Sequence, residues 1–236
     1  MWFNSSNLEA NVSNSCIFSL GTEEKLDHIG IGAYQILLNN TYQTMQKFTA
    51  GSRSTTNANF GHSCAINSDG TRMIVGAYFE DNGATDYGAV YIYTYSNGKW
   101  DGGVRIGAPT PVSGTADQGF GRSVDINSAG TRVVVGAHYD DTGANDSGAA
   151  YVYSYSNGSW TLDTVSGVST GRIQASDKAA NDRFGNSVAI SGDGTRIIVG
   201  AMQDDDGGSS SGSAYIYTYS GGSWGTEKKL IASDDQ

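Results

Sequence analysis

A segment of about sixty residues occurs three times in this chain, and this repetition constrains the fold more than any other feature. The copies begin FGHSCAINSDGTRMIVGA at Phe60, FGRSVDINSAGTRVVVGA at Phe120 and FGNSVAISGDGTRIIVGA at Phe184. Each copy later reaches a tryptophan, at Trp100, Trp160 and Trp224. Repeated units of this length bury their apolar faces against one another, so the copies are expected to stack into one array.

Each copy contains four short apolar stretches, most of them separated by turn signals. In the second copy, GRSVDIN alternates between apolar and polar residues, TRVVVGA is a short apolar run, and AAYVYSY places Tyr151, Tyr153 and Tyr155 on one face of a strand. The Asn-Gly pair before Trp160 is a hairpin signal that adds a fourth strand. The unit is therefore predicted to be a four-stranded antiparallel meander, the blade of an all-β β-propeller.

The chain is predicted to be one repeat array of about four blades. Residues 51–112, 113–175 and 176–236 form blades 2, 3 and 4, and residues 1–50 form a degenerate first blade or an N-terminal arm. In the first blade, NLEANVS, SCIFSLG and the two halves of GAYQILLNNTYQTMQKFTA take the four strand positions. Such an array either closes as a small propeller or forms a partial ring that is completed by association.

The composition favours short strands with tight turns, and it argues against nucleic-acid binding and against membrane insertion. The 33 glycines supply the positive φ angles that tight turns need. A net charge of −10 disfavours nucleic acid, and the apolar runs are too short for membrane insertion. The N-terminus lacks the features of a secretory signal, and the sequence leaves open whether Cys16 and Cys64 are bonded and whether the Asn-X-Ser/Thr sites are glycosylated.

The shared motifs FGxSVAIS, TRIIVGA and SGSAYIYTY resemble the FG-GAP repeat of integrin-α-type β-propellers over residues 60–236. The resemblance implies a propeller, usually of seven blades in integrins, with adhesion or scaffold roles outside the cell. Integrin repeats hold calcium in the turn between the first two strands. Here that turn has lost its later acidic ligand and carries Arg72, Arg132 or Arg196 nearby, which opposes calcium. These arginines are predicted instead to pair with carboxylates or to bind carbonyl groups.

The acidic loop between the second and third strands of each blade is the better calcium candidate. Carboxylates on glycine-rich turns, together with backbone carbonyls, are the oxygen ligands that Ca²⁺ requires. The predicted ligands are Asp81, Asp86, Asp140, Asp141, Asp146, Asp204, Asp205 and Asp206. The alternative is that these aspartates form solvated turns and bind their own backbone.

The sequence favours architecture over catalysis. The histidines, His28, His62 and His138, occupy non-equivalent positions, and no nucleophile, metalloprotease or phosphate-binding motif is present. The tyrosine stripes are expected to pack between blades, although exposed tyrosines would also suit stacking on sugars.

The first hypothesis is a non-catalytic structural or adhesion module, located outside the cell, on a cell surface or on a virion, that assembles with other copies or partners. The alternative is a glycan- or receptor-binding head with loops supported by Ca²⁺. An accessory domain of a larger enzyme is the third hypothesis.

Overall fold

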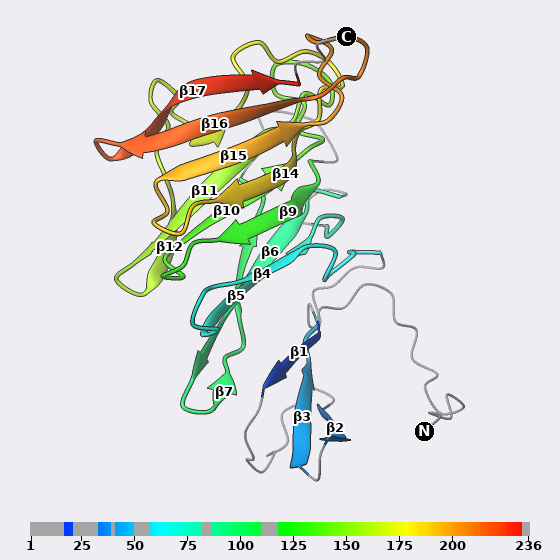
Figure 1. Cartoon of the computed structure of the whole chain (residues 1–236), viewed down its shortest axis with the longest axis vertical. Coiled ribbons are helices and arrows are strands. Elements are labelled where there is room, and N and C mark those ends of the chain that lie inside the picture. The colour runs from blue at the N-terminus through cyan, green and yellow to red at the C-terminus, as the bar shows by residue number, and fades with distance from the viewer. Residues whose placement is uncertain are drawn as a thin grey trace. The chain divides into compact units, whose positions relative to one another are not determined.

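The computed structural model describes residues 17–20, 33–38, 41–49, 57–81, 86–109 and 118–232, and these contain strands and no helix (Figure 1). It follows that no helix in the described part of the chain could cross a membrane. The chain divides into two compact units, Met1–Thr49 and Ala50–Gln236. All-β architecture is therefore confirmed for the described residues.

The first unit contains a three-stranded antiparallel sheet of β1 (Ile17–Leu20), β2 (Ala33–Leu38) and β3 (Thr41–Lys47) in the order β1-β3-β2. The predicted hairpin of β2 and β3 is present, but the predicted meander is wrong, because β1 pairs with β3 and not with β2. The expected strand at residues 7–13 lies outside the described residues.

The second unit contains three antiparallel sheets with four strand positions each, which we call blades 2, 3 and 4; in blades 2 and 3 the outer position is shared by two short strands. Blade 2 consists of β4 (Cys64–Ile66), β5 (Arg72–Ala77), β6 (Ala89–Ser96) and an outer position split between β7 (Lys99–Trp100) and β8 (Val104–Gly107). Blade 3 consists of β9 (Phe120–Ile126), β10 (Arg132–Ala137), β11 (Ala149–Ser156) and an outer position split between β12 (Ser159–Leu162) and β13 (Arg172–Ile173). Blade 4 consists of β14 (Phe184–Ile190), β15 (Arg196–Ala201), β16 (Ser213–Ser220) and β17 (Ser223–Ile231).

The turn predicted from the Asn-Gly pair is present in blade 3. Asn157 and Gly158 have φ angles of 50° and 83°, as a type I′ turn requires. The turn aligns Trp160 opposite Tyr155, so that the two rings lie 5.2 Å apart. The outer hairpin of the blade is therefore fixed by local sequence.

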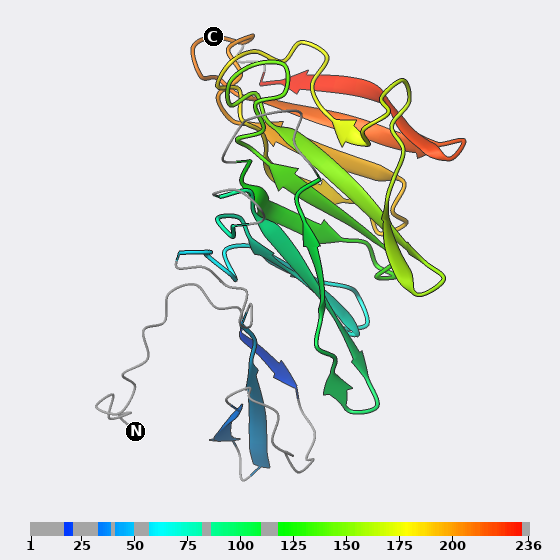
Figure 2. The ribbon, with the colours of Figure 1, turned by 180° about the vertical axis from the view of Figure 1, so that it is seen from behind.

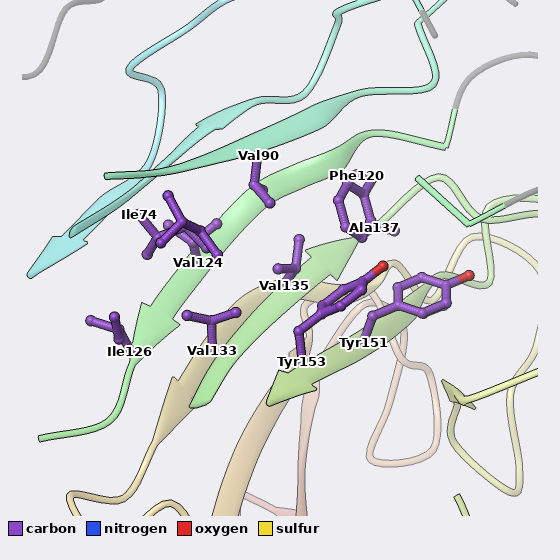
Figure 3. Close-up of a cluster of buried hydrophobic side chains, with 12 residues drawn as sticks. Ile74, Val90, Phe120, Val124, Ile126, Val133, Val135, Ala137, Tyr151 and Tyr153 are labelled. Atoms are coloured by element: carbon purple, nitrogen blue, oxygen red, sulfur yellow. The ribbon is translucent and has the colours of Figure 1, made fainter. Parts of the chain in front are cut away.

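The three blades stack face to face in chain order, as Figures 1 and 2 show. Side chains at alternate positions of β5 and β6, such as Ile74 and Val90, pack against Phe120, Val133 and Val135 of blade 3 (Figure 3). The opposite face of blade 3 packs in the same way on blade 4. Blade 3 therefore buries one face against blade 2 and the other against blade 4, as expected of a propeller.

The tyrosine stripes belong to these interfaces, which confirms the packing prediction. Tyr151 and Tyr215 have no exposed surface, and Tyr153 and Tyr217 are 7% and 5% exposed. Their rings meet Phe120 and Phe184 edge to face, at 5.7 Å for the Phe120–Tyr151 pair. Because these rings are enclosed, they are not a surface for stacking on sugars.

Candidate functional site

Each acidic loop buries its first carboxylate against a tyrosine and a cation. In blade 3, the Asp140 side chain is fully buried and accepts hydrogen bonds from the Tyr151 hydroxyl at 2.8 Å and from Arg172 Nε at 3.1 Å. Burial, with the Asp140 charge, raises the pKa of Tyr151, so the phenol remains a donor. The charge of this predicted calcium ligand is therefore balanced from within the blade.

The same arrangement, which we call the acid node, recurs in the neighbouring blades. In blade 2, Glu80 accepts hydrogen bonds from Tyr91 and Arg105, both at 2.6 Å. In blade 4, Asp204 accepts hydrogen bonds from Tyr215 at 2.6 Å and from Lys229 at 2.9 Å. In every case the tyrosine comes from the third strand and the cation from the outer position of the blade. The acid node is thus a structural element of the repeat.

The node of blade 4 gathers the most carboxylates. Oxygen atoms of Asp177, Asp204 and Asp206 lie within 4.8 Å of one another, a spacing that suits a metal ion. The Lys229 ammonium lies 2.8, 2.9 and 2.5 Å from these three carboxylates, in that order. Burial alone would raise the pKa of Asp204, but hydrogen bonds from Tyr215 and Lys229 outweigh it and lower that pKa. Lys229 therefore supplies a cation where a metal ion would bind.

The second aspartate of each loop binds backbone instead of approaching an ion. The Oδ1 atoms of Asp81 and Asp141 accept the backbone N–H groups of Asp86 and Asp146 at 3.1 and 2.7 Å. In blade 4, Asp205 accepts the N–H of Ser210. Burial first, and then the neighbouring aspartate, raise the pKa values of Asp86 and Asp146. In these contacts the aspartates bind the backbone of their own turn, as the alternative interpretation of the loops predicts. Calcium binding by the loops stays a prediction.

Among the predicted ligands, the structure brings Asp204 and Asp206 together and leaves the others in separate contacts. Sequence reasoning missed Asp177 because it precedes the inner strand, in a segment without any acidic repeat. It also missed Arg105, Arg172 and Lys229, which occupy the outer strand position. The signal that could have found them is one basic residue in that position of each blade.

A second repeated feature joins one blade to the next through the arginine that opens the second strand. Arg132 Nη1 donates to the carbonyl oxygen of Gly194 at 2.7 Å, and its Cζ lies 3.9 Å from the Tyr219 ring centre and 5.6 Å from that of Trp224. Its Nε also lies 3.2 Å from Asp163, on its own blade. We call this set of contacts the arginine clamp.

Arg72 makes the equivalent clamp onto blade 3. Its Nη1 donates to the carbonyl oxygen of Gly130 at 2.7 Å, and its Cζ lies 4.1 Å from the Tyr155 ring and 5.5 Å from the Trp160 ring. Burying a guanidinium on an aromatic face while it binds a carbonyl fixes both the position and the orientation of the next blade. The structural role predicted for these arginines is confirmed for Arg72 and Arg132.

The turn that precedes the arginine is closed by hydrogen bonds of its own. Asp69 Oδ1 accepts the N–H and hydroxyl of Thr71 at 2.9 and 2.6 Å, and Asp193 makes the same contacts with Thr195. Hydrogen bonds from Ser191 and Thr195 lower the pKa of Asp193 to about 2. These carboxylates therefore serve as acceptors within the turn.

A close backbone contact accompanies each clamp. Ser123 Oγ donates to the carbonyl oxygen of Gly185, the glycine of the next Phe-Gly pair, at 2.9 Å. A Cβ atom at Gly136 would lie 2.0 Å from that same oxygen, so only glycine fits there. Ser63 and Gly76 repeat the contact with Gly121. The glycine of the Phe-Gly pair is thus the point where successive blades touch.

Blade 4 has the residues of this interface, and within the described residues no blade packs on them. Ile198 is 40% exposed, whereas its equivalents Ile74 and Val134 are fully buried. Ile198 lies opposite Ile216, which lies opposite Lys228, so these side chains share one face of the sheet. Leu230, which is 39% exposed, and the exposed Arg196 share that face. We call this surface of Arg196, Ile198, Ile216, Lys228 and Leu230 the open face.

Comparison with known proteins explains the repeated contacts. The FG-GAP repeat profile matches residues 42–93, 110–153 and 168–217, together more than half of the chain. The chain belongs to the FG-GAP repeat family. Each match contains a Phe-Gly pair, the arginine that opens the second strand, the whole second strand and most of the third strand.

The relatives of this FG-GAP chain include integrins. Integrin alpha-6 of Gallus gallus is 35% identical over 165 residues, which cover 62% of this chain and 14% of that protein. Integrin alpha-6 of Homo sapiens is 32% identical over 163 residues, which cover 62% of this chain and 13% of that protein. The chain thus matches about one seventh of the length of these relatives.

Two solved structures also align with this chain. A putative 6-phosphogluconolactonase from Bacteroides uniformis aligns with a TM-score of 0.46 and 13% identity, over 93% of this chain and 54% of that one. A periplasmic gluconolactonase of Pseudomonas aeruginosa aligns with a TM-score of 0.31 and 11% identity, over 87% of this chain and 69% of that one. At these scores neither likeness bears on what this FG-GAP chain does.

Proposed function

We propose that this chain is a non-catalytic structural or adhesion module that works outside the cell or on a cell or virion surface by binding other proteins. The observation that carries this proposal is that the charged groups repeated in the described blades bind other parts of the fold: the acid nodes bind a tyrosine and a cation of their own blade, and the arginine clamps join one blade to the next. The match to integrins supports a protein partner and an extracellular location.

The acid nodes favour a structural role for the buried carboxylates. The buried carboxylates of Glu80, Asp140 and Asp204 are each bound to a tyrosine and to a side-chain cation. Carboxylates that are neutralised in this way stabilise the blade and are not available to an ion or a substrate without loss of an ion pair. A structural role therefore accounts for these three carboxylates.

The second candidate is a binding head with loops supported by Ca²⁺. Its support is the cluster of Asp177, Asp204 and Asp206, whose carboxylate oxygens have the spacing of metal ligands. For calcium to bind there, Lys229 has to leave the cluster and the ion has to replace its three ion pairs. The two candidates therefore differ in whether Ca²⁺ stabilises the folded chain.

Thermal unfolding with calcium or with a chelator separates the two candidates. For the structural module, the midpoint in calcium and the midpoint in EDTA should agree within about 1 °C. A calcium site saturated at 100 times its dissociation constant adds about 2.7 kcal/mol, which raises the midpoint of a chain this long by roughly 5–10 °C. Such a rise, combined with calcium-dependent binding on a glycan array, would replace the structural proposal with the binding head.

A further inference from the structure

A row of cationic and aromatic side chains lies at the rim where the inner strands β9 and β14 begin and the second strands end, on the right in Figure 1. The first part of the row joins blades 2 and 3. Arg122 follows the Phe-Gly pair of blade 3, and its Cζ atom lies 5.4 Å from the ring centre of Tyr78, which follows β5. The His62 ring lies 4.6 Å from the same tyrosine ring, and its Nε2 atom contacts Arg122 Nη1.

The second part of the row joins blades 3 and 4 in a similar way. Arg183 precedes the Phe-Gly pair of blade 4, and its Cζ atom lies 5.3 Å from the ring centre of Tyr139. The His138 ring lies 3.8 Å from the Tyr139 ring and 6.2 Å from the Tyr78 ring. His138 is therefore next to both of the rings over which the arginines lie. We call Arg122, His138 and Arg183 the rim cluster.

The rim cluster is not part of the repeated blade. The acid nodes and the arginine clamps recur between blades, as contacts that each blade needs for its own structure should. The positions of Arg122, His138 and Arg183 are occupied in the other blades by His62 and Asn186, by Tyr78 and Met202, and by Asn59 and Gly119, respectively. The construction of a blade does not account for such a cluster, which favours a role in binding.

Arg183 also has a backbone conformation that arginine disfavours. Its φ angle is 57°, and the equivalent residues Asn59 and Gly119 have φ angles of 52° and 60°. Asparagine and glycine adopt this left-handed region readily, whereas a longer side chain is strained there. Because asparagine or glycine satisfies the fold at this position, the strained arginine indicates that its side chain is used.

The positive charge of the rim cluster has no carboxylate partner within the described residues. None of the ion pairs in the described part of the chain includes Arg122 or Arg183. The Nε atoms of both arginines and the Nδ1 atom of His138, a residue that is 3% exposed, are buried without a hydrogen-bond partner. Burial, followed by the charges of Arg122 and Arg183, lowers the pKa of His138 to about 3. An anion at the cluster would relieve this repulsion.

The described carboxylates beside Arg183 have other contacts. Asp182, which precedes it, accepts the backbone N–H of Ala179. Arg183 lowers the pKa of Asp146, but burial and the charge of Asp141 outweigh this effect and raise that pKa. Neither Asp182 nor Asp146 therefore neutralises the rim cluster.

The chemistry of the cluster indicates one class of ligand. Arg122 and Arg183 are partly exposed, so an anion can reach their guanidinium groups from solvent. A guanidinium group binds a carboxylate through two parallel hydrogen bonds. A polyanion would be repelled by the net charge of −10 and by exposed aspartates such as Asp81 and Asp205. The cluster therefore suits a single carboxylate group.

We propose that the rim cluster binds a carboxylate side chain of a protein partner, with Arg122 and Arg183 as the hydrogen-bond donors. This inference deepens the proposed function and rests on it, because it names the chemistry through which the partner is held. A bound carboxylate offsets the charge of the cluster, whereas an amide of the same shape leaves that charge unpaired.

An NMR titration of the full chain with acetyl-Gly-Glu-Gly-amide tests the site, and acetyl-Gly-Gln-Gly-amide is the matched probe. Two charge-assisted hydrogen bonds to one carboxylate correspond to a dissociation constant of about 1–10 mM. The backbone signals of Arg122, His138 and Arg183 should shift on binding, and the glutamine peptide should bind at least about tenfold more weakly. Equal binding of the two peptides, or no binding of either, would overturn the inference.

Arg122→Asn and Arg183→Asn introduce the residues that blades 4 and 2 have at the same positions, so the fold is expected to tolerate them. Each should weaken binding of the glutamate peptide at least about fivefold. Arg196→Asn, at an exposed arginine of blade 4 outside the cluster, should change it by less than about twofold. Peptide binding that is unaffected by the first two substitutions would overturn the inference.

Chemical unfolding of Arg183→Asn without peptide distinguishes a binding role from a structural one. The unfolding equilibrium constant should stay within about twofold or shift toward the folded chain, because asparagine relieves the strain at this φ angle. A shift of about tenfold toward the unfolded chain would show that Arg183 holds the blades together, and it would overturn the assignment of a binding role.

Two further comparisons test the source and the class of the ligand. If Asp117, which lies outside the described residues, occupies the cluster, Asp117→Asn should tighten binding of the glutamate peptide about fivefold or more, which would overturn the assignment to a partner. An unchanged dissociation constant supports it. Sulfate that binds more tightly than the glutamate peptide would overturn the assignment to a carboxylate. Each of these failures concerns the inference alone, because the proposed function is tested separately by thermal unfolding with calcium or a chelator.

Discussion

Gly136→Ala tests whether successive blades are held at the distance that the glycine contacts indicate. A Cβ atom at this position would lie 2.0 Å from the carbonyl oxygen of Gly185 and 2.4 Å from the Ser123 hydroxyl. Gly200 is its equivalent on blade 4, where a Cβ atom would meet the Ser187 hydroxyl at 2.4 Å and no backbone of a following blade. Neither glycine has the left-handed φ angle that disfavours alanine. The two substitutions therefore differ mainly in the presence of a neighbouring blade.

The expected cost follows from the movement that the methyl group requires. To reach an ordinary contact distance, the Gly185 carbonyl has to retreat by more than about 1 Å, which breaks the hydrogen bond from Ser123 and loosens the core between blades 3 and 4. Overpacking of this kind costs about 1–3 kcal/mol, and the lost hydrogen bond adds about 1 kcal/mol. We expect Gly136→Ala to cost about 3 kcal/mol. At Gly200 the Ser187 side chain can rotate away from the new methyl group. Replacing a glycine within a strand by alanine also stabilises the folded chain by about 0.5–1 kcal/mol. We therefore expect Gly200→Ala to change the free energy of unfolding by less than about 1 kcal/mol.

Guanidinium unfolding followed by tryptophan fluorescence measures both variants against the unmodified chain. The reasoning holds if Gly136→Ala lowers the free energy of unfolding by at least about 2 kcal/mol more than Gly200→Ala does. Equal effects would refute it, because they would mean that the backbone of blade 4 does not approach Gly136 as closely as the structure indicates.

Two further predictions concern the charged groups of the blades. Lys229→Met removes the cation that offsets the buried Asp204 and should cost about 3 kcal/mol in guanidinium unfolding at pH 7, whereas Lys228→Met, on the exposed face of the same strand, should cost less than about 0.5 kcal/mol. The hydrogen bonds of the node lower the pKa of Asp204 below 3.8. The stabilisation that ionised Asp204 provides is therefore present above pH 3.8 and is lost as the pH falls through the pKa of Asp204 in the folded chain. The loss of unfolding free energy caused by Lys229→Met should accordingly shrink between about pH 5 and pH 2. Asp146→Asn should stabilise the chain by about 0.5 kcal/mol at pH 7, because burial and Asp141 raise the pKa of Asp146 and asparagine tolerates its φ of 50°. That gain should vanish below pH 3.8, where Asp146 is protonated in both the folded and the unfolded chain.

Features of the fold that depend on local sequence were predictable. The Asn157-Gly158 pair forms the expected hairpin turn, and the tyrosines of β11 share one face because side chains alternate along a strand. The pairing of β1 with β3 was not predictable, since local sequence does not determine which strand of the hairpin an earlier strand joins. The split of the outer strand of blade 3 into β12 and β13 was missed for a similar reason, because both pieces pair with β11 across an intervening loop.

The candidate site was predictable in position but not in chemistry. The spacing of the aspartates predicted where the acidic loops lie. The same spacing is compatible both with a calcium site and with a turn in which the aspartates bind their own backbone. What distinguishes these alternatives in blade 3 is Arg172, which reaches Asp140 from 32 residues away in the sequence. Local spacing contains no information about such a contact, because it is created by the pairing of β13 with β11. The partner of a buried charge is therefore a property of the topology.

The acid node stabilises a single blade, whereas the arginine clamp joins successive blades. The node acts within a blade, where it ties the loop after the second strand to the third strand and the outer strand, and its cation can be arginine or lysine. The clamp acts between blades, and its ligands come from the successor apart from Asp163 and Ser154, which contact Arg132 Nε from its own blade. A blade at the end of a stack can therefore complete its node from its own residues but cannot complete its clamp. In the described residues of blade 4 the node is complete, because Lys229 is bound to three carboxylates, whereas Arg196 is exposed. The node therefore depends on the sequence of a single blade, whereas the clamp also depends on the Tyr–Trp pair and the turn carbonyl of the blade that follows.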